Sequence, residues 1–431
     1  MAAPRCSVPE WRNWTGDQAC RPAAVVAPAD RDELRAAVAA APKVRVAGAG
    51  HSFSDAVLTD GTLLALHRLD RVLDVDPASG TVRVEAGITL HALSEALAAH
   101  GLALPNLGDI DVQSVAGATA TGTHGTGATL PNLSAAIRSV ELTLAGGDVV
   151  ELDGGDELLA ARVSLGALGV VSAVTLQAVP AFTLDGVDAP APLEETLDRL
   201  DELAAANDHF ELFTFPHSPL ALTRTNNRTD APARPRGAAR RWAEDILLAN
   251  HVFEAFCRVG KARPSWIPAL NRMVSRLAGS SHRRDRSDHI FSSPRRVRFT
   301  EMEYALPRAH LAAAVRAVRA LIAERGFAVP FPLEVRMVAP DDALLSPAGG
   351  RDTGYVAVHM YRRMDWEPYF RAVETIMDGF DGRPHWGKRH FQTADTLWPR
   401  YPGWGRFATV RDRLDPDRVF TNAYVERVLG P

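Results

Sequence analysis

The alternation of apolar and polar residues predicts short, closely spaced strands with a few helices between them. Apolar side chains at every second position predict strands at 63–66, 72–75 and 81–85. Residues 31–41 are rich in alanine and begin with acidic side chains, which is typical of a helix. Thr89 is a candidate N-cap for a second helix, which Gly101 ends. This order indicates an α+β fold rather than a regular series of βαβ units.

The second half of the chain repeats this mixture. A hairpin is expected at 137–152, and a strand at 170–179 ends at Pro180, where we place the first domain boundary. Further helices are expected at 194–206, 308–325 and 367–379, and further strands at 297–306, 332–338 and 354–361. The arginine-rich stretch 224–298 is interpreted as a solvated helical insertion, with an anion-binding patch as the alternative.

Length and composition narrow the class of protein. The chain has 431 residues, which suits two or three domains, and a net charge of −4, which argues against a nucleic-acid-binding protein. No apolar run is long enough to span a bilayer, and the N-terminal residues lack the apolar core of a signal peptide. Cys6, Cys20 and Cys257 are too scattered for a disulfide framework or a zinc site, so we expect a cytoplasmic protein without a metal.

A glycine-rich turn follows the predicted strand that begins at Val44. The sequence Gly48-Ala49-Gly50-His51 lacks the third glycine and the acidic residue of a dinucleotide fingerprint. Glycines still allow backbone N–H groups to converge on a phosphate. We therefore expect this loop to hold a cofactor in some way other than a plain Rossmann site.

A second candidate ligand loop spans 105–127 and consists almost entirely of small residues. Glycine, alanine and threonine permit the backbone to approach a flat ligand, and the hydroxyl groups can form hydrogen bonds to it. Long loops of this kind in compact domains are usually functional. His124, within this loop, is equally consistent with a ligand contact and with a structural hydrogen bond.

Several polar residues interrupt the predicted strands of the second half. Glu334 and Arg336 share one face of a strand, where they form either a surface ion pair or a polar pair facing a cleft. His359 and Tyr361 alternate in the same way on the next strand. Lys388 is either a solvated lysine or a cation beside a group that becomes negatively charged. No Ser-His-Asp order, Walker loop or metal-spaced histidine cluster is present.

Taken together, these segments resemble the vanillyl-alcohol-oxidase (PCMH) type of FAD enzymes, and within it the aldonolactone oxidases, with alditol oxidases as relatives. Four blocks occur in the family's order: residues 47–53, 106–125, 333–336 and 385–388. Asp415-Pro416 with Phe420 and Asn422 adds to the likeness. The resemblance covers nearly the whole chain.

The resemblance implies a division into three parts: an FAD-binding domain at 1–180, a substrate or cap domain at 181–380, and a C-terminal segment at 381–431 that completes the flavin site. It implies that His51 is bonded covalently to the flavin. The implied cofactor contacts are Ala47, Gly48, Ala49, Gly50, His51, Ser52, Phe53, Gly108, Ser114, Gly117, Thr121, Gly122, Thr123, His124, Val171 and Lys388.

The resemblance also implies a catalytic trio of Glu334, Arg336 and Lys388. Arg336 would bind a substrate oxygen, Glu334 would hold sugar hydroxyls, and Lys388 would stabilise negative charge on the flavin as it accepts hydride. Asp109, His359 and Tyr361 are further candidates for substrate binding.

The implied reaction is oxidation of an aldono-1,4-lactone, with electrons passing to O2 to give H2O2. Gly108 lies where the family's oxidases carry a small residue, which favours the use of O2. Asp109 replaces the serine of alditol oxidases, which favours lactones over open polyols. A dehydrogenase with another acceptor, an alditol oxidase and a flavin-binding protein without turnover remain alternatives.

Overall fold

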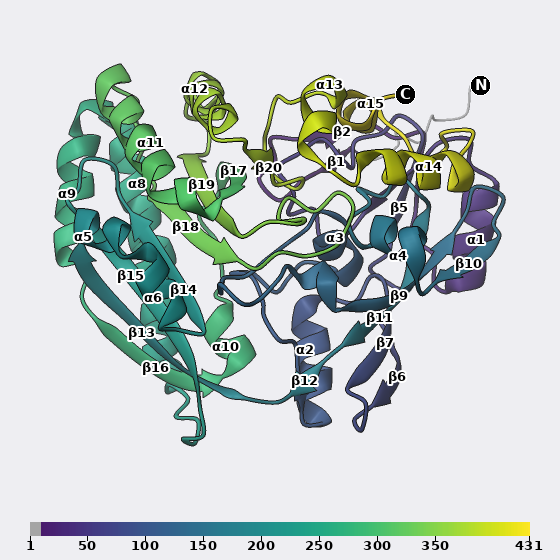
Figure 1. Ribbon diagram of the computed structural model, residues 1–431, viewed down its shortest axis with the longest axis horizontal. Coiled ribbons are helices and arrows are strands. Elements are labelled where there is room, and N and C mark those ends of the chain that lie inside the picture. The colour runs from purple at the N-terminus through teal and green to yellow at the C-terminus, as the bar shows by residue number, and fades with distance from the viewer. Residues whose placement is uncertain (1–9) are drawn as a thin grey trace, which may run out of the picture.

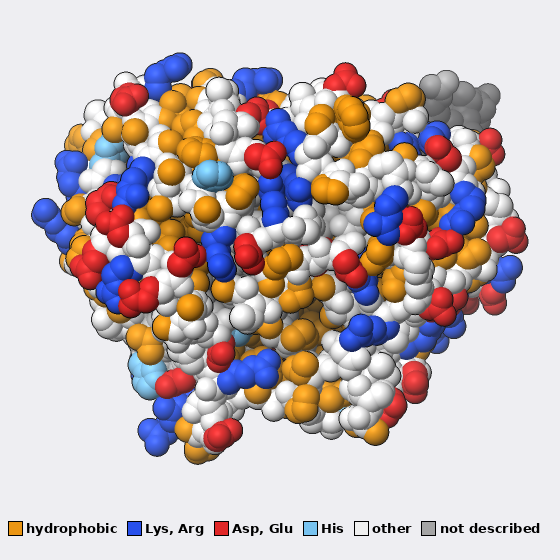
Figure 2. Space-filling model, viewed as in Figure 1, with side chains coloured by type: hydrophobic (Ala, Val, Ile, Leu, Met, Phe, Trp, Pro, Cys, Tyr) orange, Lys and Arg blue, Asp and Glu red, His pale blue; other side chains and the backbone are white. Residues whose placement is uncertain are grey.

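The computed structural model describes residues 10–431 and shows two halves side by side, with the C-terminal helices lying on the half formed by the N-terminal chain (Figure 1). Cys6 lies outside the described residues. Acidic and basic side chains are interspersed over the face in Figure 2, in keeping with the small net charge. In residues 10–431 we find no helix that combines the length and the apolar character needed to cross a bilayer.

The first half contains two sheets. The parallel sheet has the order β3-β5-β4, and the antiparallel sheet has the order β10-β9-β11-β7-β6. The strands are β3 (Ala24–Val26), β4 (Val44–Ala47), β5 (Thr62–Ala65), β6 (Val72–Asp76), β7 (Thr81–Glu85), β9 (Ile137–Thr143), β10 (Val149–Leu152) and β11 (Val170–Gln177). The predicted strands and the predicted 137–152 hairpin are all confirmed, within one or two residues at their ends.

Several helices lie between the strands of the first half. They are α1 (Arg31–Ala39), α2 (Leu90–Ala99), α3 (Val115–Ala120) and α4 (Gly155–Arg162). The Thr89 hydroxyl accepts a hydrogen bond from the backbone N–H of Ala92, which confirms the predicted N-cap of α2. The stretch 105–127, expected to be a loop throughout, contains α3, because Ser114 caps it and accepts from the N–H of Gly117.

The second half is built on one antiparallel sheet of eight strands, in the order β16-β13-β15-β14-β18-β19-β17-β20. The strands are β13 (Thr183–Pro192), β14 (His209–Thr214), β15 (Leu220–Thr229), β16 (Ser281–Arg286), β17 (Phe299–Pro307), β18 (Leu333–Val338), β19 (Thr353–Tyr361) and β20 (Arg383–Pro384). The predicted domain boundary at 180 lies between β12 (Val179–Pro180), which pairs with β8 (Leu102–Ala103), and β13. We keep that division as a proposal.

Side chains on the central strands of this sheet alternate strictly between two environments. Leu212, Val335 and Val358 belong to an apolar core that also contains residues of the covering helices. These helices are α5 (Leu193–Asp198), α6 (Leu200–Ala205), α11 (Leu311–Arg325) and α12 (Glu367–Asp378). Because side chains alternate along a strand, the intervening residues of β14, β17, β18 and β19 face the other way, toward the first half.

Two sequence predictions about helices need correction. The helix expected at 194–206 is divided into α5 and α6 at Arg199. The helical insertion is found at α7 (Ala238–Arg241), the π-helical turn Trp242–Val252, α8 (Phe253–Ala262), α9 (Ile267–Leu277) and α10 (Ser287–Phe291). The arginines at 283, 284 and 286 instead lie on β16, because that segment pairs with β13 and their side chains meet acidic partners on it and nearby.

The remaining elements are short or lie near the C-terminus. They are β1 (Trp11–Arg12), β2 (Ala19–Cys20), α13 (Ala394–Leu397), α14 (Trp404–Leu414), α15 (Ala423–Leu429) and the 3-10 turns Leu133–Ala136, Pro264–Trp266, Arg308–His310 and Trp398–Arg400.

A buried arginine joins the glycine loop to two distant segments. The Arg45 guanidinium donates to the carbonyl oxygens of Ala56, Leu165, Gly166 and Phe420. Burial lowers the pKa of Arg45 to about 10, so the side chain stays charged at neutral pH. These bonds attach the C-terminal segment at Phe420 to β4 and to the turn before β11.

We expect Arg45→Leu to destabilise the protein by about 3 kcal/mol, because it leaves buried carbonyl groups without donors. Urea unfolding followed by circular dichroism would measure the loss. Arg68→Leu is the control, since Arg68 is exposed and, among the described residues, donates to a single carbonyl oxygen, that of Ala27. Equal midpoints for the two variants would contradict this assignment.

Candidate active site

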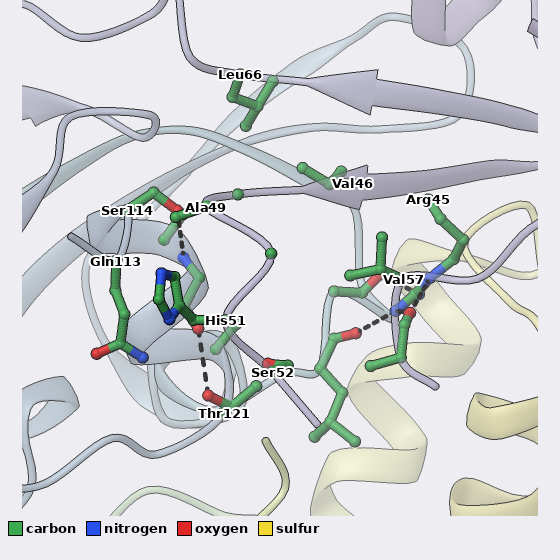
Figure 3. Close-up of a pocket in the computed structure, with 18 of the residues that line it drawn as sticks. Arg45, Val46, Ala49, His51, Ser52, Val57, Leu66, Gln113, Ser114 and Thr121 are labelled. Carbon is green, nitrogen blue, oxygen red and sulfur yellow. Dashed lines mark hydrogen bonds between the residues drawn. The ribbon is translucent and has the colours of Figure 1, made fainter. Parts of the chain in front are cut away.

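A narrow cavity of about 110 Å³ runs over the glycine loop (Figure 3). Its walls come from the loop itself, from the start of α3 and from the turn before β11. Among the predicted cofactor residues it is lined by Gly48, Ala49, Gly50, His51, Ser52, Ser114, Gly117, Thr121 and Val171. The two glycine-rich segments, which are distant in sequence, therefore form one groove.

The glycine loop presents backbone donors that the protein itself does not use. Within residues 10–431, the N–H groups of Ala49, Gly50, His51 and Ser52 have no hydrogen-bonding partner. Gly50 adopts a φ of 70°, a left-handed conformation that turns the loop. Consecutive free amides in such a turn form a concave site for phosphate oxygens.

The same loop lies directly against the start of α3. A Cβ atom added at Gly48 would lie 2.3 Å from the Ser114 hydroxyl oxygen, so only glycine fits there. Close packing of Gly48 against Ser114 therefore brings the glycine loop and the start of α3 together as adjoining walls of the groove. An elongated cofactor that carries phosphates fits these free amides and this shape.

A larger cavity of about 410 Å³ continues from the first and opens between the two halves of the protein. The two cavities share His51, Ser52, Gln113 and Thr121 in their walls. The larger cavity is also lined by the predicted residues Phe53, Gly108, Asp109, Thr123, His124, Glu334, Arg336, His359 and Lys388. Residues from all three parts of the chain therefore meet around one space.

His51 lies at the junction of the two cavities. Its imidazole stacks on Trp14, with 5.1 Å between the ring centroids, and has no hydrogen-bonding partner within residues 10–431. Burial, followed by the charge of Lys388, lowers the pKa of His51 to about 4. The ring is therefore neutral at pH 7, with a nitrogen lone pair that the protein leaves free.

The ammonium group of Lys388 is held by a carboxylate that the sequence analysis did not identify. Lys388 Nζ lies 2.5 Å from Glu301 Oε2, and Glu301 Oε1 lies 3.5 Å from His359 Nε2. Burial opposes the charge on Lys388, but Glu301 and Glu303 outweigh it, and the pKa of Lys388 is raised. The lysine is therefore a fixed cation in the cavity wall.

His359 contacts the protein through both ring nitrogens. Nδ1 lies 3.1 Å from the Pro332 carbonyl oxygen, to which it must donate, and Nε2 faces Glu301. His359 therefore lines the cavity with its ring held between two oxygens of the protein. Its main effect is to hold Glu301 in place opposite Lys388.

A second histidine–glutamate pair, His124 and Glu303, lies beside His359 and Glu301. His124 Nδ1 faces the Gly125 carbonyl oxygen at 2.8 Å, and Nε2 lies 3.2 Å from Glu303 Oε1. The imidazole stacks on Tyr355, with 3.7 Å between ring centroids. Glu303 is thus satisfied by His124, as Glu301 is satisfied by Lys388 and His359.

Arg336 is surrounded by acidic side chains farther along the same face of the sheet. Its guanidinium contacts Asp109, lies 2.6 Å from Glu334 Oε1 and donates to Glu211 Oε2 at 2.8 Å. Arg295 takes the second oxygen of Asp109, at 2.8 Å. The Glu334–Arg336 pair therefore faces the cavity, which resolves the choice that the sequence pattern left open.

The carboxylates around Arg336 differ in their charge state. Burial, reinforced by Asp109 and Glu211 and opposed by Arg336, raises the pKa of Glu334 to about 8. Burial also opposes the charge on Asp109, but Arg336 and Arg295 outweigh it and lower its pKa. Glu334 therefore holds a proton more readily than an ordinary carboxyl group, and in that form it can donate a hydrogen bond to a substrate oxygen.

Three predicted site residues do not line either cavity. Ala47 is buried in β4, and Gly122 forms a left-handed turn against Val163 and Pro347. Tyr361 lies on the same strand face as His359 but farther along, where its hydroxyl donates to Glu254 of α8. Asp109 lines the cavity, yet both of its oxygens are engaged by arginines.

Further residues of the site were not predicted from the sequence: Glu301, Glu303, Glu211 and Trp14. Glu301 and Glu303 lie two residues apart within an otherwise apolar strand, and this pattern is the same signal that identified Glu334 and Arg336. Glu211 carries the same signal, because it lies between Phe210 and Leu212. Trp14 carries none, because its partner His51 comes from another part of the chain.

The fold and the paired cavities define the class of protein: an FAD-dependent oxidoreductase of the PCMH type. A family model described as FAD binding domain matches residues 22–153. The crystal structure of cholesterol oxidase from B. sterolicum has the same fold, with a TM-score of 0.83 over 98% of this chain and 96% of that one, at 19% sequence identity.

The chain belongs to the D-arabinono-1,4-lactone oxidase family, whose model matches residues 174–428. The L-gulono-1,4-lactone dehydrogenase of Mycobacterium tuberculosis is 52% identical over 98% of this chain and 100% of its own length. An alditol oxidase of Streptomyces sp. is 37% identical, over 97% of this chain and 98% of its own. The L-gulonolactone oxidase of Bos taurus is 34% identical over the same shares.

We expect Glu301→Gln to move the alkaline limb of the kcat/KM profile to lower pH by at least about one unit. Glu301 helps to raise the pKa of Lys388, so without its charge the ammonium loses its proton at a lower pH. The measurement is a pH series of initial rates with the isolated holoenzyme. Glu324→Gln, an exposed change on α11, is the control, and an unmoved limb would refute the role given to Glu301.

Proposed function

We propose that this protein oxidises an aldono-1,4-lactone at the hydroxyl-bearing carbon next to the carbonyl. The observation that carries the proposal is that Glu334, Arg336 and Lys388 line one cavity, in which Glu334 and Arg336 form an ion pair. His51 lies where this cavity joins the narrow cofactor groove. The names of its relatives, which include gulonolactone and arabinonolactone enzymes, support the same substrate class.

FAD, when bound, would supply the acceptor for the hydride that leaves the substrate carbon. The residues of the chain would do the rest. Arg336 would bind a substrate oxygen through the edge of its guanidinium, and protonated Glu334 would donate to a second oxygen. Lys388 would stabilise negative charge as it develops, because its ammonium is fixed by Glu301 rather than by water.

The experiment that tests this function is a stopped-flow series under anaerobic conditions. Holoenzyme is mixed with gulono-, galactono- and arabinono-1,4-lactones and with xylitol and sorbitol, and flavin absorbance is followed. We expect rapid bleaching by at least one lactone, and Lys388→Met should slow it by at least about a hundredfold. Bleaching by polyols but not by lactones would replace this proposal with an alditol oxidase.

We further propose that His51 is bonded covalently to the flavin. The neutral imidazole, free of hydrogen bonds and placed where the cavities join, supports this role. After acid precipitation, the yellow chromophore should stay with the wild-type protein and be released from His51→Ala. His100→Ala, which alters an exposed histidine, should retain it. Release from the wild-type protein would exclude the bond.

We propose O2 as one electron acceptor, and Gly108 supports this. A Cβ atom at this position would lie 3.2 Å from the His124 carbonyl oxygen, so glycine leaves a space that alanine would fill. Gly108→Ala should slow reoxidation by O2 at least about tenfold and leave anaerobic reduction unchanged. The control is Gly146→Ala on an exposed turn, and peroxide released under air provides a second measurement.

A dehydrogenase that uses another acceptor is the second candidate. The observation in its favour is that the relative that is 52% identical over nearly the whole chain is named an L-gulono-1,4-lactone dehydrogenase. Wild-type enzyme that is reduced by a lactone but forms no peroxide under air would establish this alternative.

A further inference from the structure

A third cavity, of about 330 Å³, lies behind Lys388 and has no part in the function proposed above. Three separate parts of the chain form it: residues 53–55 after the glycine loop, the start of α12, and the C-terminal segment with α15. In Figure 1, α12 and α15 both lie along the upper edge of the molecule. The cavity is thus located where the two halves and the C-terminal chain meet.

This cavity is separated from the other two by single side chains. Phe53 and Lys388 line both the third cavity and the substrate cavity, and Ser54 lines both the third cavity and the narrow cofactor groove. A molecule bound here would therefore lie next to the cofactor site without displacing the substrate. That position suits a second reactant.

The walls combine flat aromatic rings with guanidinium groups stacked on them. The guanidinium carbon of Arg371 lies 3.8 Å from the ring centroid of Phe391, and that of Arg389 lies 4.4 Å from the ring centroid of Trp366. Arg427 is stacked 5.1 Å from Tyr424. Stacking fixes the plane of each guanidinium, so the N–H groups that protein partners leave free have a defined direction toward an oxygen acceptor.

The charges on these arginines are unequally compensated. Arg371 is paired with Glu367 at 2.7 Å and Arg389 with Asp17 at 2.6 Å. Arg427 donates to the Gln392 carbonyl oxygen, and within residues 10–431 no carboxylate lies within 4.0 Å of it. The cavity therefore offers many hydrogen-bond donors with little excess charge, which suits a polar neutral ligand better than a strong anion.

Two buried polar atoms in the wall have no partner in the described part of the chain. They are the Ser54 hydroxyl oxygen and His390 Nδ1, and both residues are more than nine-tenths buried. His390 Nε2 lies 2.9 Å from the Tyr424 hydroxyl, which itself donates to the Trp386 carbonyl oxygen. Nε2 must therefore carry the proton, and Nδ1 presents a bare lone pair that requires a donor.

We propose that this third cavity binds a quinone, which serves as an electron acceptor for the enzyme. A quinone ring is flat and can stack between the aromatic walls, and its carbonyl oxygens accept hydrogen bonds from the arginines. After reduction, its hydroxyl groups are donors, as His390 Nδ1 requires. A phosphate or sulfate ion would leave the aromatic walls unused.

This inference rests on the proposed function for its source of electrons. Overall, the carbinol group of the lactone loses two electrons and two protons and becomes a carbonyl. The quinone gains the same two electrons and two protons, one proton on each oxygen, and becomes a hydroquinone. No further oxidant or reductant is needed.

The test uses holoenzyme whose flavin has been reduced anaerobically with one equivalent of dithionite, so that the result does not depend on the lactone. The reduced enzyme is mixed in a stopped-flow instrument with the water-soluble 2,3-dimethoxy-5-methyl-1,4-benzoquinone. We expect the rate of flavin reoxidation to saturate as the quinone concentration rises. A rate that rises linearly over the whole soluble range would show a collision without a site and would overturn the proposal.

Variants locate the site. Arg371→Gln and Arg427→Gln should each raise the half-saturating quinone concentration at least threefold, and the double variant about tenfold, while reoxidation by O2 stays within twofold of wild type. The matched control is Arg325→Gln, because Arg325 is an exposed arginine that also stacks on a phenylalanine, Phe327, outside the cavity. Unchanged half-saturation in both single variants, or an equal effect of Arg325→Gln, would overturn the assignment.

Discussion

The site depends on three backbone hydrogen bonds that hold residues 385–389 between the two halves of the protein. His385 N–H donates to the Glu303 carbonyl oxygen and Arg389 N–H to that of Glu301, both at 2.9 Å. The Gly387 carbonyl oxygen accepts from Phe53 N–H at 2.8 Å. The C-terminal segment is therefore fixed at once to the edge of the large sheet and to the end of the glycine loop. Since Lys388 lies within this segment, the same bonds determine where its ammonium group is held.

Charge pairing then gives two neighbouring clusters on the sheet face different roles. In one cluster, Glu301 is shared by Lys388 and His359, so the carboxylate stabilises a cation. In the other, Arg336 contacts several carboxylates, and burial together with the neighbouring carboxylates raises the pKa of one of them, Glu334. Buried ion pairs are poor sources of stability because both charges lose water. Their value here is that each group enters the cavity in a defined charge state and position, which is what a hydride-transfer site requires.

Much of the fold followed from local sequence. The strands at 63–66, 72–75 and 81–85 and the Thr89 cap were predicted because their signals lie within a few neighbouring residues. The break at Arg199 was not predicted, since alanine-rich and leucine-rich sequence favours a continuous helix and tertiary packing overrides it. The arginines of β16 were assigned to helices for a related reason: the acidic partners that stabilise them on a strand lie on β13 and on α2, and are distant in sequence.

The sequence alone determined which chemical groups are present and in which local setting: a glycine loop that ends in His51, a small-residue segment before His124, and an acid–base pair on one face of a strand. These features were recognisable because turns, caps and two-residue alternation depend on adjacent residues. Only the tertiary structure decided that Glu301 holds Lys388, that both nitrogens of His359 face protein oxygens, and that Tyr361 lies away from the cavity. Such contacts join segments tens to hundreds of residues apart, and the burial and neighbouring charges that set each pKa exist only once those segments are packed together.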